Sequence, residues 1–309
     1  MTKLVVVGSS NTDMIIQVPH IPAPGETILG SEFLTAAGGK GANQAVAAAR
    51  IGGDVSLVAC VGADMFGEQA LAGFASDGIN TKYCNVNDKA PSGVAQILVA
   101  DSGENSIAVA PGANYLLSPG CIAKTRDLLN NAAVVLMQLE IPVDTVLESA
   151  RLARASGAKV ILNPAPACAL PDEIFSLLDL LTPNESEIEL LTGISVTDEN
   201  SMAAAASILH ERGVSVVLLT RGAQGVFLSE KKGNEIRTSI FSAFQVTPID
   251  TTAAGDVFNG CLAVSLAADH PLAESIKFAQ AAAAISVQTL GAQTSAPTLE
   301  EVENFLQRV

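Results

Sequence analysis

Near its N-terminus the sequence reads LVVVGSSNTD, residues 4–13. Four apolar residues, three of them β-branched, end at Gly8, a pattern typical of a strand buried on both faces of a sheet. Similar runs recur along the chain, and helical patterns lie between them. Buried strands that alternate with helices predict a mainly parallel sheet covered by helices on both faces. The further expected strands lie in the runs that begin at Val55, Ala133, Lys159, Leu177 and Ser215.

The segments between these runs have helical patterns, and each ends at or near a glycine, which commonly closes a helix. The sequence after residue 270 predicts one more helix, the loop TLGAQTSAP and a terminal helix from about Thr298. The internal helices are expected in the segments that begin at Gly41, Gly67, Thr145, Glu185 and Ser201.

Two stretches break the alternation. Residues 12–37 hold the strand-like pieces MIIQV and ETILGSEFL, and residues 92–114 read as a hairpin around the turn DSGEN. Because crossover helices would be expected at both places, we interpret the stretches as excursions that pair into a small second sheet. The predicted architecture is a single three-layer α/β domain over residues 1–309, with a small β-sheet contributed by about residues 12–38 and 92–114.

The composition fits a globular protein with a large aliphatic core. The chain has 309 residues, of which 49% are hydrophobic, 16% charged and only 4% aromatic. Its formal net charge of −15 disfavours nucleic acid and anionic membranes as partners, since both require a basic face. It does not exclude a small anionic ligand held by backbone N–H groups.

Cysteine usage and the N-terminus indicate a cytoplasmic protein. The five cysteines are scattered and form no CxxC pair, which argues against a disulfide framework or a zinc site. The segment MTKLVVVGSS has an apolar run too short for a signal peptide. No window of eighteen uncharged apolar residues occurs, so no membrane span is expected.

The segment AAGGKGANQAVAAARIG, which begins at Ala36, places three glycines around Lys40. It is not a P-loop, because Gly41 follows the lysine where Ser or Thr is required and Thr35 stands where a glycine is required. The glycines indicate a backbone that bends or lets a ligand approach closely. Asn43 in the next helical turn suits either a ligand contact or a helix cap.

The segment TTAAGDVFNG, Thr251–Gly260, places small residues before a helix. The first turn of a helix carries free N–H groups and about half a positive charge. Gly255 lacks a Cβ, so an anion could touch the N–H groups near Ala254 and Asp256. Asp256 could serve only as a cap. Alternatively, it could accept the proton of an attacking hydroxyl beside an anion site, since loose phosphoryl transfer needs only a weak base.

Other polar residues stand where ligands bind in α/β folds. Asn11 and Asp13 follow the first strand and Glu140 ends another, so all three are expected at the carboxyl edge of the sheet. Asn184 and Glu187 lie three apart at the start of a helix, which suits either a helix cap or a hydrated Mg²⁺ with phosphate oxygens. The turn TRGAQGV after residue 219 suits either a nucleotide or an ordinary hairpin.

Taken together, GGKGANQAVAAA and DTTAAGDVFNG resemble the two signature motifs of the ribokinase/phosphofructokinase-B family of carbohydrate kinases. The further segments GSSNTD, PGET, LMQLE, NPAPA, TPNESE and GAQTSAP extend the resemblance over nearly the whole chain. It implies ATP-dependent phosphorylation of D-ribose at its 5-hydroxyl. A related sugar such as 2-deoxyribose or fructose is the alternative, although the polar Asn11 suits a sugar that bears a 2-hydroxyl.

Two other activities fit less well. An adenosine kinase would need an aromatic surface for the purine, and the chain is only 4% aromatic. A sugar sensor that lost catalysis would not be expected to keep the Gly255–Asp256 pair and the NESE segment.

The resemblance also implies roles for individual residues. Asp256 is the implied catalytic base, and Ala253, Ala254, Gly255 and Asp256 form the anion hole. The small sheet is the implied lid and the homodimer interface, and Glu187 is linked to Mg²⁺ through water. The implied sugar-binding residues are Asn11, Asp13, Gly39, Lys40, Gly41, Asn43, Glu140 and Asp256. The implied nucleotide-binding residues are Asn184, Thr220, Gly222, Gly225, Gly255 and Gln280. The implied K⁺ ligands are Asp250, Thr252, Ser286, Thr289, Gly291 and Ser295.

Overall fold

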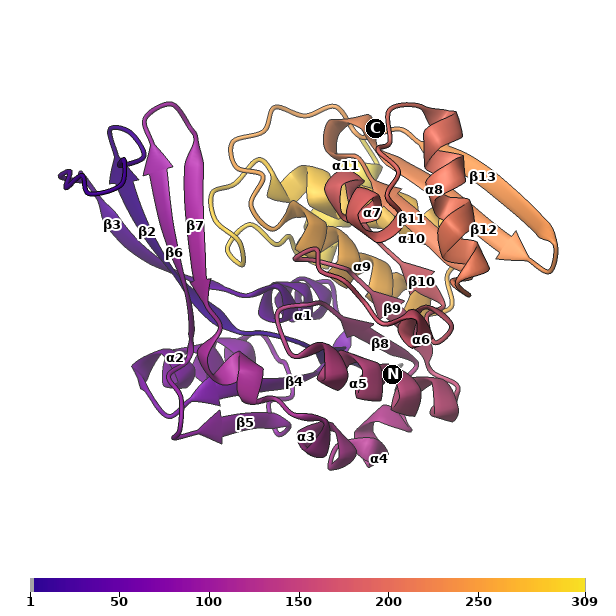
Figure 1. The fold of residues 1–309 in the computed structure, drawn as a ribbon, viewed down its shortest axis with the longest axis horizontal. Helices are drawn as coiled ribbons and strands as arrows, with labels where there is room; N and C mark the ends of the chain where they lie inside the picture. The colour runs from indigo at the N-terminus through magenta and orange to yellow at the C-terminus, as the bar shows by residue number, and fades with distance from the viewer. Residues whose placement is uncertain (1–2, 309) are drawn as a thin grey trace.

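The computed structural model describes residues 3–308 and has a large sheet at its centre (Figure 1). The strand order is β13-β12-β11-β10-β9-β8-β1-β4-β5. In this order, the seven strands β11, β10, β9, β8, β1, β4 and β5 run parallel to one another. Strands β12 and β13 are antiparallel additions at one edge. The strands are β1 (Lys3–Val7), β4 (Asp54–Gly62), β5 (Cys84–Asn87), β8 (Val134–Met137), β9 (Lys159–Leu162), β10 (Leu180–Leu181), β11 (Val216–Thr220), β12 (Val226–Lys232) and β13 (Glu235–Phe241).

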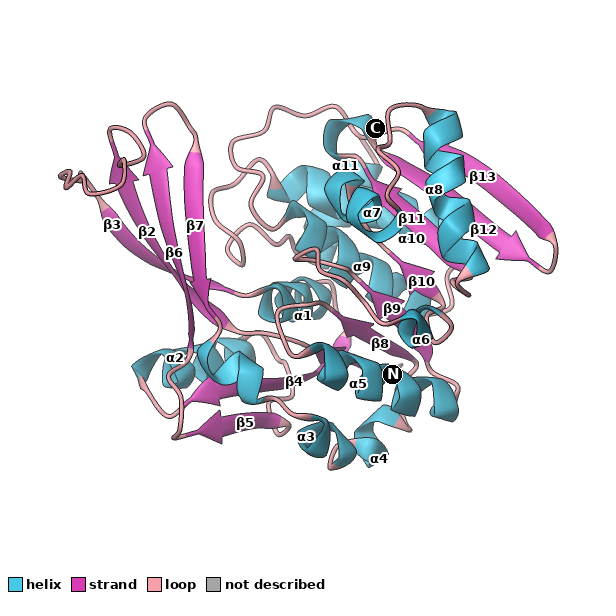
Figure 2. Ribbon diagram, viewed as in Figure 1, coloured by secondary structure: helices cyan, strands magenta, loops and turns pink. Residues whose placement is uncertain are grey.

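Helices cover both faces of this sheet, which confirms the predicted three-layer α/β architecture (Figure 2). Val5 and Val7 of β1 point into one core, whereas Leu4 and Val6 point into the other, as the two-residue period of a strand requires. The first core is closed by α3 (Pro119–Ala123), α4 (Arg126–Leu129), α5 (Val143–Ser156), α6 (Asp172–Phe175), α7 (Glu185–Thr192) and α8 (Glu199–Glu211). The second is closed by α1 (Lys40–Arg50), α2 (Met65–Ser76), α9 (Ala254–Ala267), α10 (Leu272–Ser286) and α11 (Leu299–Leu306).

The two excursions form the expected second sheet, which stands beside the main body at the left of Figure 1. Its order is β3-β2-β6-β7, with β2 and β6 parallel from Asn11↔Gly93 to Val18↔Ala100. The hairpin around DSGEN is confirmed by the antiparallel pairing of β6 with β7. The strands are β2 (Asn11–Val18), β3 (Phe33–Gly38), β6 (Gly93–Ala100) and β7 (Asn105–Ala110).

Some sequence expectations differ from the structure in extent. The strand expected in ETILGSEFL begins only at Phe33, because the residues before it form turns and irregular backbone. The run LLDLLTPN contributes only Leu180–Leu181 to the sheet, since Leu177 and Leu178 close the turn after α6. The turn TRGAQGV is both a short 3₁₀ helix, Gly222–Gln224, and the connection of the β11–β12 hairpin.

The N-terminal half of α1 is held close to two other segments by glycines. A Cβ added at Gly41 would lie 2.5 Å from the backbone nitrogen of Ser9, and one added at Gly260 of α9 would overlap the carbonyl of Gln44. No side chain fits at either contact. The consequence is that α1, α9 and the segment after β1 meet backbone to backbone.

The direction of chain progression reverses between β1 and β8. From β1 the chain continues to β4 and β5 on one side, whereas β8, β9, β10 and β11 follow one another on the other side. Ligands of open α/β sheets bind at the carboxyl ends of the strands at such a switch point. Within residues 3–308, no helix has the length and apolar character needed to cross a bilayer.

Candidate active site

Hydrogen-bonded polar groups lie at the switch point between β1 and β8. The carboxylate of Glu140 accepts hydrogen bonds from Ser9 Oγ at 2.5 Å and from the backbone nitrogen of Lys40 at 2.9 Å. The N–H of Gly41 donates to Ser9 Oγ at 3.2 Å. One carboxylate therefore ties the segment after β1 to the first turn of α1.

Asp256 is buried at the start of α9, with 6% of its surface exposed. Asn43 Nδ2 donates to Oδ2 at 3.0 Å, and Gln44 Nε2 donates to Oδ1 at 2.9 Å. Asn43 Oδ1 is buried and has no partner among the described residues. Because buried polar atoms are almost always hydrogen-bonded, this open acceptor favours a ligand that brings a hydroxyl or N–H donor to it.

Four carboxylates and one ammonium group share the region around Asp256. Burial raises the pKa of Asp13 to about 6, with further contributions from the charges of Glu140 and Asp256. The pKa of Lys40 is raised, chiefly by Asp256 and against the cost of its own burial. Burial also raises the pKa of Glu187. Excess negative charge is thus gathered around a single lysine.

The first turn of α9 presents backbone N–H groups. Ala253 precedes it in the left-handed region, at φ 59°, which is uncommon for a residue with a side chain. The N–H of Ala254 donates to the Thr251 carbonyl at 3.3 Å, whereas those of Gly255 and Asp256 have no acceptor among the described residues. A Cβ at Gly255 would meet nothing within 4 Å, so the missing side chain leaves open space beside these donors.

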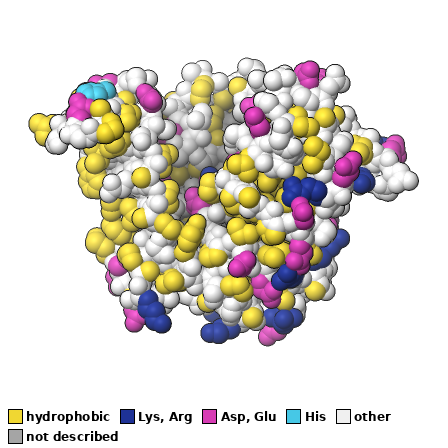
Figure 3. All heavy atoms as spheres, viewed as in Figure 1, with side chains coloured by type: hydrophobic (Ala, Val, Ile, Leu, Met, Phe, Trp, Pro, Cys, Tyr) yellow, Lys and Arg dark blue, Asp and Glu magenta, His cyan; other side chains and the backbone are white. Residues whose placement is uncertain are grey.

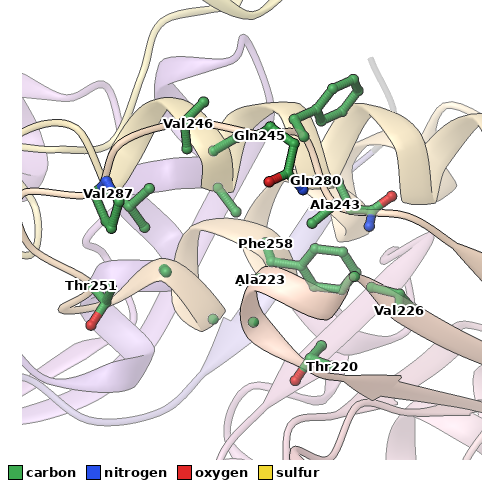
Figure 4. Close-up of a pocket in the computed structure, with 18 residues that line it drawn as sticks. Thr220, Ala223, Val226, Ala243, Gln245, Val246, Thr251, Phe258, Gln280 and Val287 are labelled. Atoms are coloured by element: carbon green, nitrogen blue, oxygen red, sulfur yellow. The ribbon is translucent and has the colours of Figure 1, made fainter.

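A pocket of about 370 Å³ adjoins this turn (Figure 4). Its walls are mostly apolar, as binding pockets for small molecules commonly are. Gln280 lies at its edge and donates through Nε2 to the carbonyls of Phe241 and Ser242, at 3.2 and 3.4 Å. The predicted residues that line the pocket are Thr220, Gly222, Gly225, Ala254, Gly255 and Gln280.

Asn184 and Glu187 form a capping box at the start of α7. Asn184 Oδ1 accepts from the N–H of Glu187 at 2.8 Å, and the Glu187 carboxylate accepts from the N–H and Nδ2 of Asn184 at 2.8 and 2.9 Å. An isolated bridge pairs Asn184 with Thr220 at the pocket wall. The helix-cap interpretation is therefore confirmed, and the same contacts hold the Glu187 carboxylate in one orientation.

The predicted cation ligands come from two adjacent loops. The Asp250 carboxylate accepts from the N–H groups of Thr252 at 2.9 Å and Gly291 at 2.8 Å, and the Val287 carbonyl accepts from the N–H of Asp250. Burial opposes ionisation of Asp250, but these hydrogen bonds outweigh it and lower its pKa. The Ser286 carbonyl accepts from the N–H of Thr289, and Ser295 Oγ donates to the Ala292 carbonyl.

Residues that sequence reasoning did not single out complete the site. Asn114 Nδ2 donates to Asn11 Oδ1 at 2.8 Å, and the Asn11 amide nitrogen has no acceptor within the part of the chain that the structure describes. Ser9 and Gln44 lie beside residues that were predicted. Ser9 stands inside the quoted segment GSSNTD and Gln44 inside GGKGANQAVAAA, so these segments could have drawn attention to both residues. Asn114 stands at the end of the 92–114 excursion, where only its position in the fold gives it a role.

The space-filling view shows a hollow between the small sheet and the main body, with charged side chains at its base (Figure 3). Asn11 and Asp13 lie on β2, at the point where the chain passes from the main sheet to the small one. Lys40, Asn43 and Glu140 approach from the main body. The predicted polar residues around Asp256 are therefore brought together from segments distant in sequence.

The raised pKa of Asp13 gives a stability prediction. A carboxyl with a folded pKa near 6 and an ordinary value of 3.8 binds its proton more tightly in the folded state. The contribution of this proton binding to the free energy of unfolding is fully present below pH 3.8 and is lost as the pH rises through 6. We expect Asp13→Asn to increase the free energy of unfolding by about 1–3 kcal/mol at pH 8, and by less at pH 5.

Urea denaturation at both pH values measures this difference. The exposed Asp101 in the DSGEN turn supplies a control, and Asp101→Asn is expected to leave the unfolding free energy nearly unchanged. Equal gains for Asp13→Asn at pH 5 and pH 8 would contradict the electrostatic cause.

Known proteins match this chain over nearly its full length. Residues 1–299 match the pfkB family carbohydrate kinase profile. A ribokinase of Haemophilus influenzae is 47% identical over 98% of both chains. The structure of a Thermotoga maritima ribokinase has a TM-score of 0.90 at 41% identity, covering 99% of this chain and 100% of that one. That of Arabidopsis thaliana ribokinase complexed with ribose and ATP has a TM-score of 0.93 at 32% identity and covers 99% of each. The chain is an enzyme that belongs to the pfkB family of carbohydrate kinases.

Proposed function

We propose that the protein transfers the γ-phosphoryl group of ATP to the 5-hydroxyl of D-ribose, giving ribose 5-phosphate and ADP. The observation that carries this proposal is the position of the Gly255–Asp256 pair. The open N–H of Gly255 borders the apolar pocket, and the Asp256 carboxylate meets Asn43 on α1. Relatives named ribokinase, one of them with ribose and ATP bound, support the choice of substrates.

In the proposed reaction, the 5-oxygen attacks the γ-phosphorus as the bond from phosphorus to the β,γ-bridging oxygen breaks. The hydroxyl proton passes to the Asp256 carboxylate, and ADP leaves with the electron pair of the broken bond. The N–H groups of Gly255 and Asp256, at the positive end of α9, stabilise the charge on the phosphoryl oxygens. Ala253 and Ala254 shape that turn.

The proposed sugar site uses the open polar atoms at the switch point. Asn43 Oδ1 has no partner within residues 3–308 and accepts from a sugar hydroxyl, and Asn11 Nδ2 donates to another. The carboxylates of Asp13 and Glu140 accept from further hydroxyls. Lys40 offsets their repulsion, and Gly39 and Gly41 let the start of α1 pack against the backbone after β1, which carries Asn11 to the site.

The proposed nucleotide site is the apolar pocket, with the base between α10 and the turn after β11. Thr220, Gly222, Gly225 and Gln280 surround it, and Asn184 lies next to Thr220. The fixed Glu187 carboxylate and the Asn184 amide suit a hydrated Mg²⁺, which would neutralise phosphate charge when bound with ATP. This hard-oxygen set fits Mg²⁺ held through water.

We expect Asp256→Asn to lower kcat by about 10²–10⁴-fold, the usual contribution of a general base. Asparagine keeps the size of the side chain, so ribose is expected to bind with little change. Steady-state kinetics together with calorimetric ribose binding separate the two effects. Near-normal turnover in this variant would refute the proposed base.

Asn11 distinguishes ribose from the alternative substrates. If its amide nitrogen donates to the 2-hydroxyl, Asn11→Leu is expected to reduce kcat/KM for ribose by about tenfold or more. The reduction for 2-deoxyribose should be much smaller. A panel of ribose, 2-deoxyribose and fructose with both proteins measures the preference directly. A wild-type enzyme that prefers fructose or 2-deoxyribose would establish the alternative, and no turnover on any sugar would refute the kinase proposal.

We propose that K⁺ binds between the loops that contain Asp250, Thr252, Ser286, Thr289, Gly291 and Ser295. The ionised Asp250 carboxylate joins the two loops by accepting from the N–H groups of Thr252 and Gly291, and backbone carbonyls of these loops would suit a large, weakly hydrated cation. Replacing K⁺ by tetramethylammonium is expected to lower kcat several-fold, which is the usual size of a coupling between two sites. The melting temperature is expected to stay nearly constant. Identical rates in the two salts would argue against the site.

We propose that residues 1–309 act as one kinase domain and that the small sheet closes over the sugar as a lid. Closure would exclude water, which otherwise competes as the phosphoryl acceptor. The sheet also exposes large apolar side chains that suit contact with a second copy, among them Ile16, Phe33, Leu34, Ile107 and Val109. A monomeric mass by sedimentation at micromolar concentration would rule out such a homodimer.

A further inference from the structure

A buried ring of hydrogen bonds begins and ends at the Gly255–Asp256 pair. Gln44 Nε2 donates to Asp256 Oδ1 at 2.9 Å and to Asn163 Oδ1 at 3.1 Å. Asn163 Nδ2 donates to the carbonyl of Thr182 at 3.2 Å. Asn259 links Thr182 back to Gly255 and so closes the ring.

Thr182 Oγ1 donates to Asn259 Oδ1 at 2.6 Å, and Asn259 Nδ2 donates to the carbonyl of Gly255 at 2.8 Å. That carbonyl belongs to the same peptide as the open N–H of Asp256. Hydrogen bonds in a chain polarise one another, so a bond to the carbonyl strengthens the N–H as a donor. The ring thus reaches both halves of the pair, the carboxylate and the peptide beside it.

Gln44 is the residue of the ring with the least freedom. It is fully buried, and Gln138 Nε2 donates to its Oε1, so both its donor hydrogens and its acceptor are used. A side-chain amide with all its groups engaged cannot flip without breaking several buried bonds at once. The backbone carbonyl of Gln44 also lies directly against Gly260 of α9.

Asn43 and Gln44 each donate to a different oxygen of the Asp256 carboxylate. Consecutive helical residues point about 100° apart, so the two amides approach different oxygens of Asp256. Asn43 keeps an open acceptor and faces the proposed ligand, whereas Gln44 faces inward to Asn163 and Gln138. This asymmetry separates a residue that contacts the sugar from one that only orients the base.

We infer that Gln44 is a positioning residue that holds the Asp256 carboxylate in the orientation needed to accept the proton of the sugar hydroxyl. The inference rests on the proposed role of Asp256. Without the Gln44 donor, Asp256 Oδ1 would lose the one side-chain partner that it has among the described residues, and the carboxylate could rotate. Small errors in the placement of a reacting group can lower rates by about 100-fold.

A double-mutant cycle tests this role. Wild type, Gln44→Met, Asp256→Asn and the double variant are compared for kcat, for KM of ribose and ATP, and for melting temperature. Methionine conserves the length of the side chain and removes its hydrogen bonds. We expect Gln44→Met to lower kcat by about 10–100-fold with KM values changed by less than about threefold.

In the Asp256→Asn background the same substitution is expected to change kcat by less than about twofold, because Gln44 acts through the carboxylate. An equal loss of kcat in both backgrounds, or unchanged kcat in Gln44→Met alone, would overturn the inference. Normal turnover of Asp256→Asn is a distinct result, which would refute the proposed base and the positioning role with it.

A matched control separates positioning from general destabilisation. Thr145 Oγ1 donates to the Leu117 carbonyl in the core on the opposite face of the sheet, so Thr145→Val also removes a buried hydrogen bond. It is expected to lower the melting temperature while kcat stays at the wild-type value. If Gln44→Met does not fold, Gln44→Glu keeps the acceptor for Gln138 and replaces the donor with an anion. Its kcat is expected to fall at least as far, and normal kcat would overturn the inference.

Discussion

The backbone contact between α1 and α9 at Gly260 is the constraint on which the site depends. Close approach at this crossing puts the first turn of α1 beside the first turn of α9. Two amides from one helix can then reach a carboxylate on the other. Gly260 of α9 and the small residues Ala47 and Ala48 of α1 meet at this contact and make the short distance possible. Helix packing and site geometry are therefore set by the same residues.

The same closeness concentrates charge. All four carboxylates, Asp13, Glu140, Asp256 and Glu187, act on Lys40, and Asp256 also repels Asp13 and Glu187 in surroundings where burial strengthens the repulsion. Such an arrangement costs folding free energy in the absence of ligand. In the proposed complex, hydroxyl donors of the sugar would offset part of this cost. Asp13 would then lower the stability of the fold above pH 6 while it serves the proposed sugar site.

Much of the architecture could be predicted because buried parallel strands leave a strong sequence pattern. The run at residues 4–7 and its repeats predicted the three layers, and the excursions predicted the small sheet. The two-residue strand β10 was predicted too long, since the half-buried Leu177 and the buried Leu178 lie in a turn and are as hydrophobic as the strand residues. The hairpin of β12 and β13 was not predicted. Strand β13 buries none of its side chains fully, and its Ile236 and Ile240 are exposed, so it lacks the pattern of a buried strand.

The site divides in the same way. Asp256, Asn43 and Glu140 could be singled out because glycines or strand ends mark them. Their roles remain predictions, whereas their proximity is observed. The ring through Gln44 could not be predicted, because hydrogen bonds across 119 and 212 residues leave no local pattern.

Position in the sheet does explain the ring after the fact. Gln138, Asn163 and Thr182 each stand directly after a neighbouring strand, β8, β9 and β10. Parallel strands end at one edge, so three polar residues at equivalent positions form a row beneath α9. An apolar row there would leave Gln44 Oε1 and Asn259 Oδ1 without the donors that they have in Gln138 and Thr182. The polar row therefore supplies hydrogen bonds that fix the orientation of both buried amides beside the Gly255–Asp256 pair.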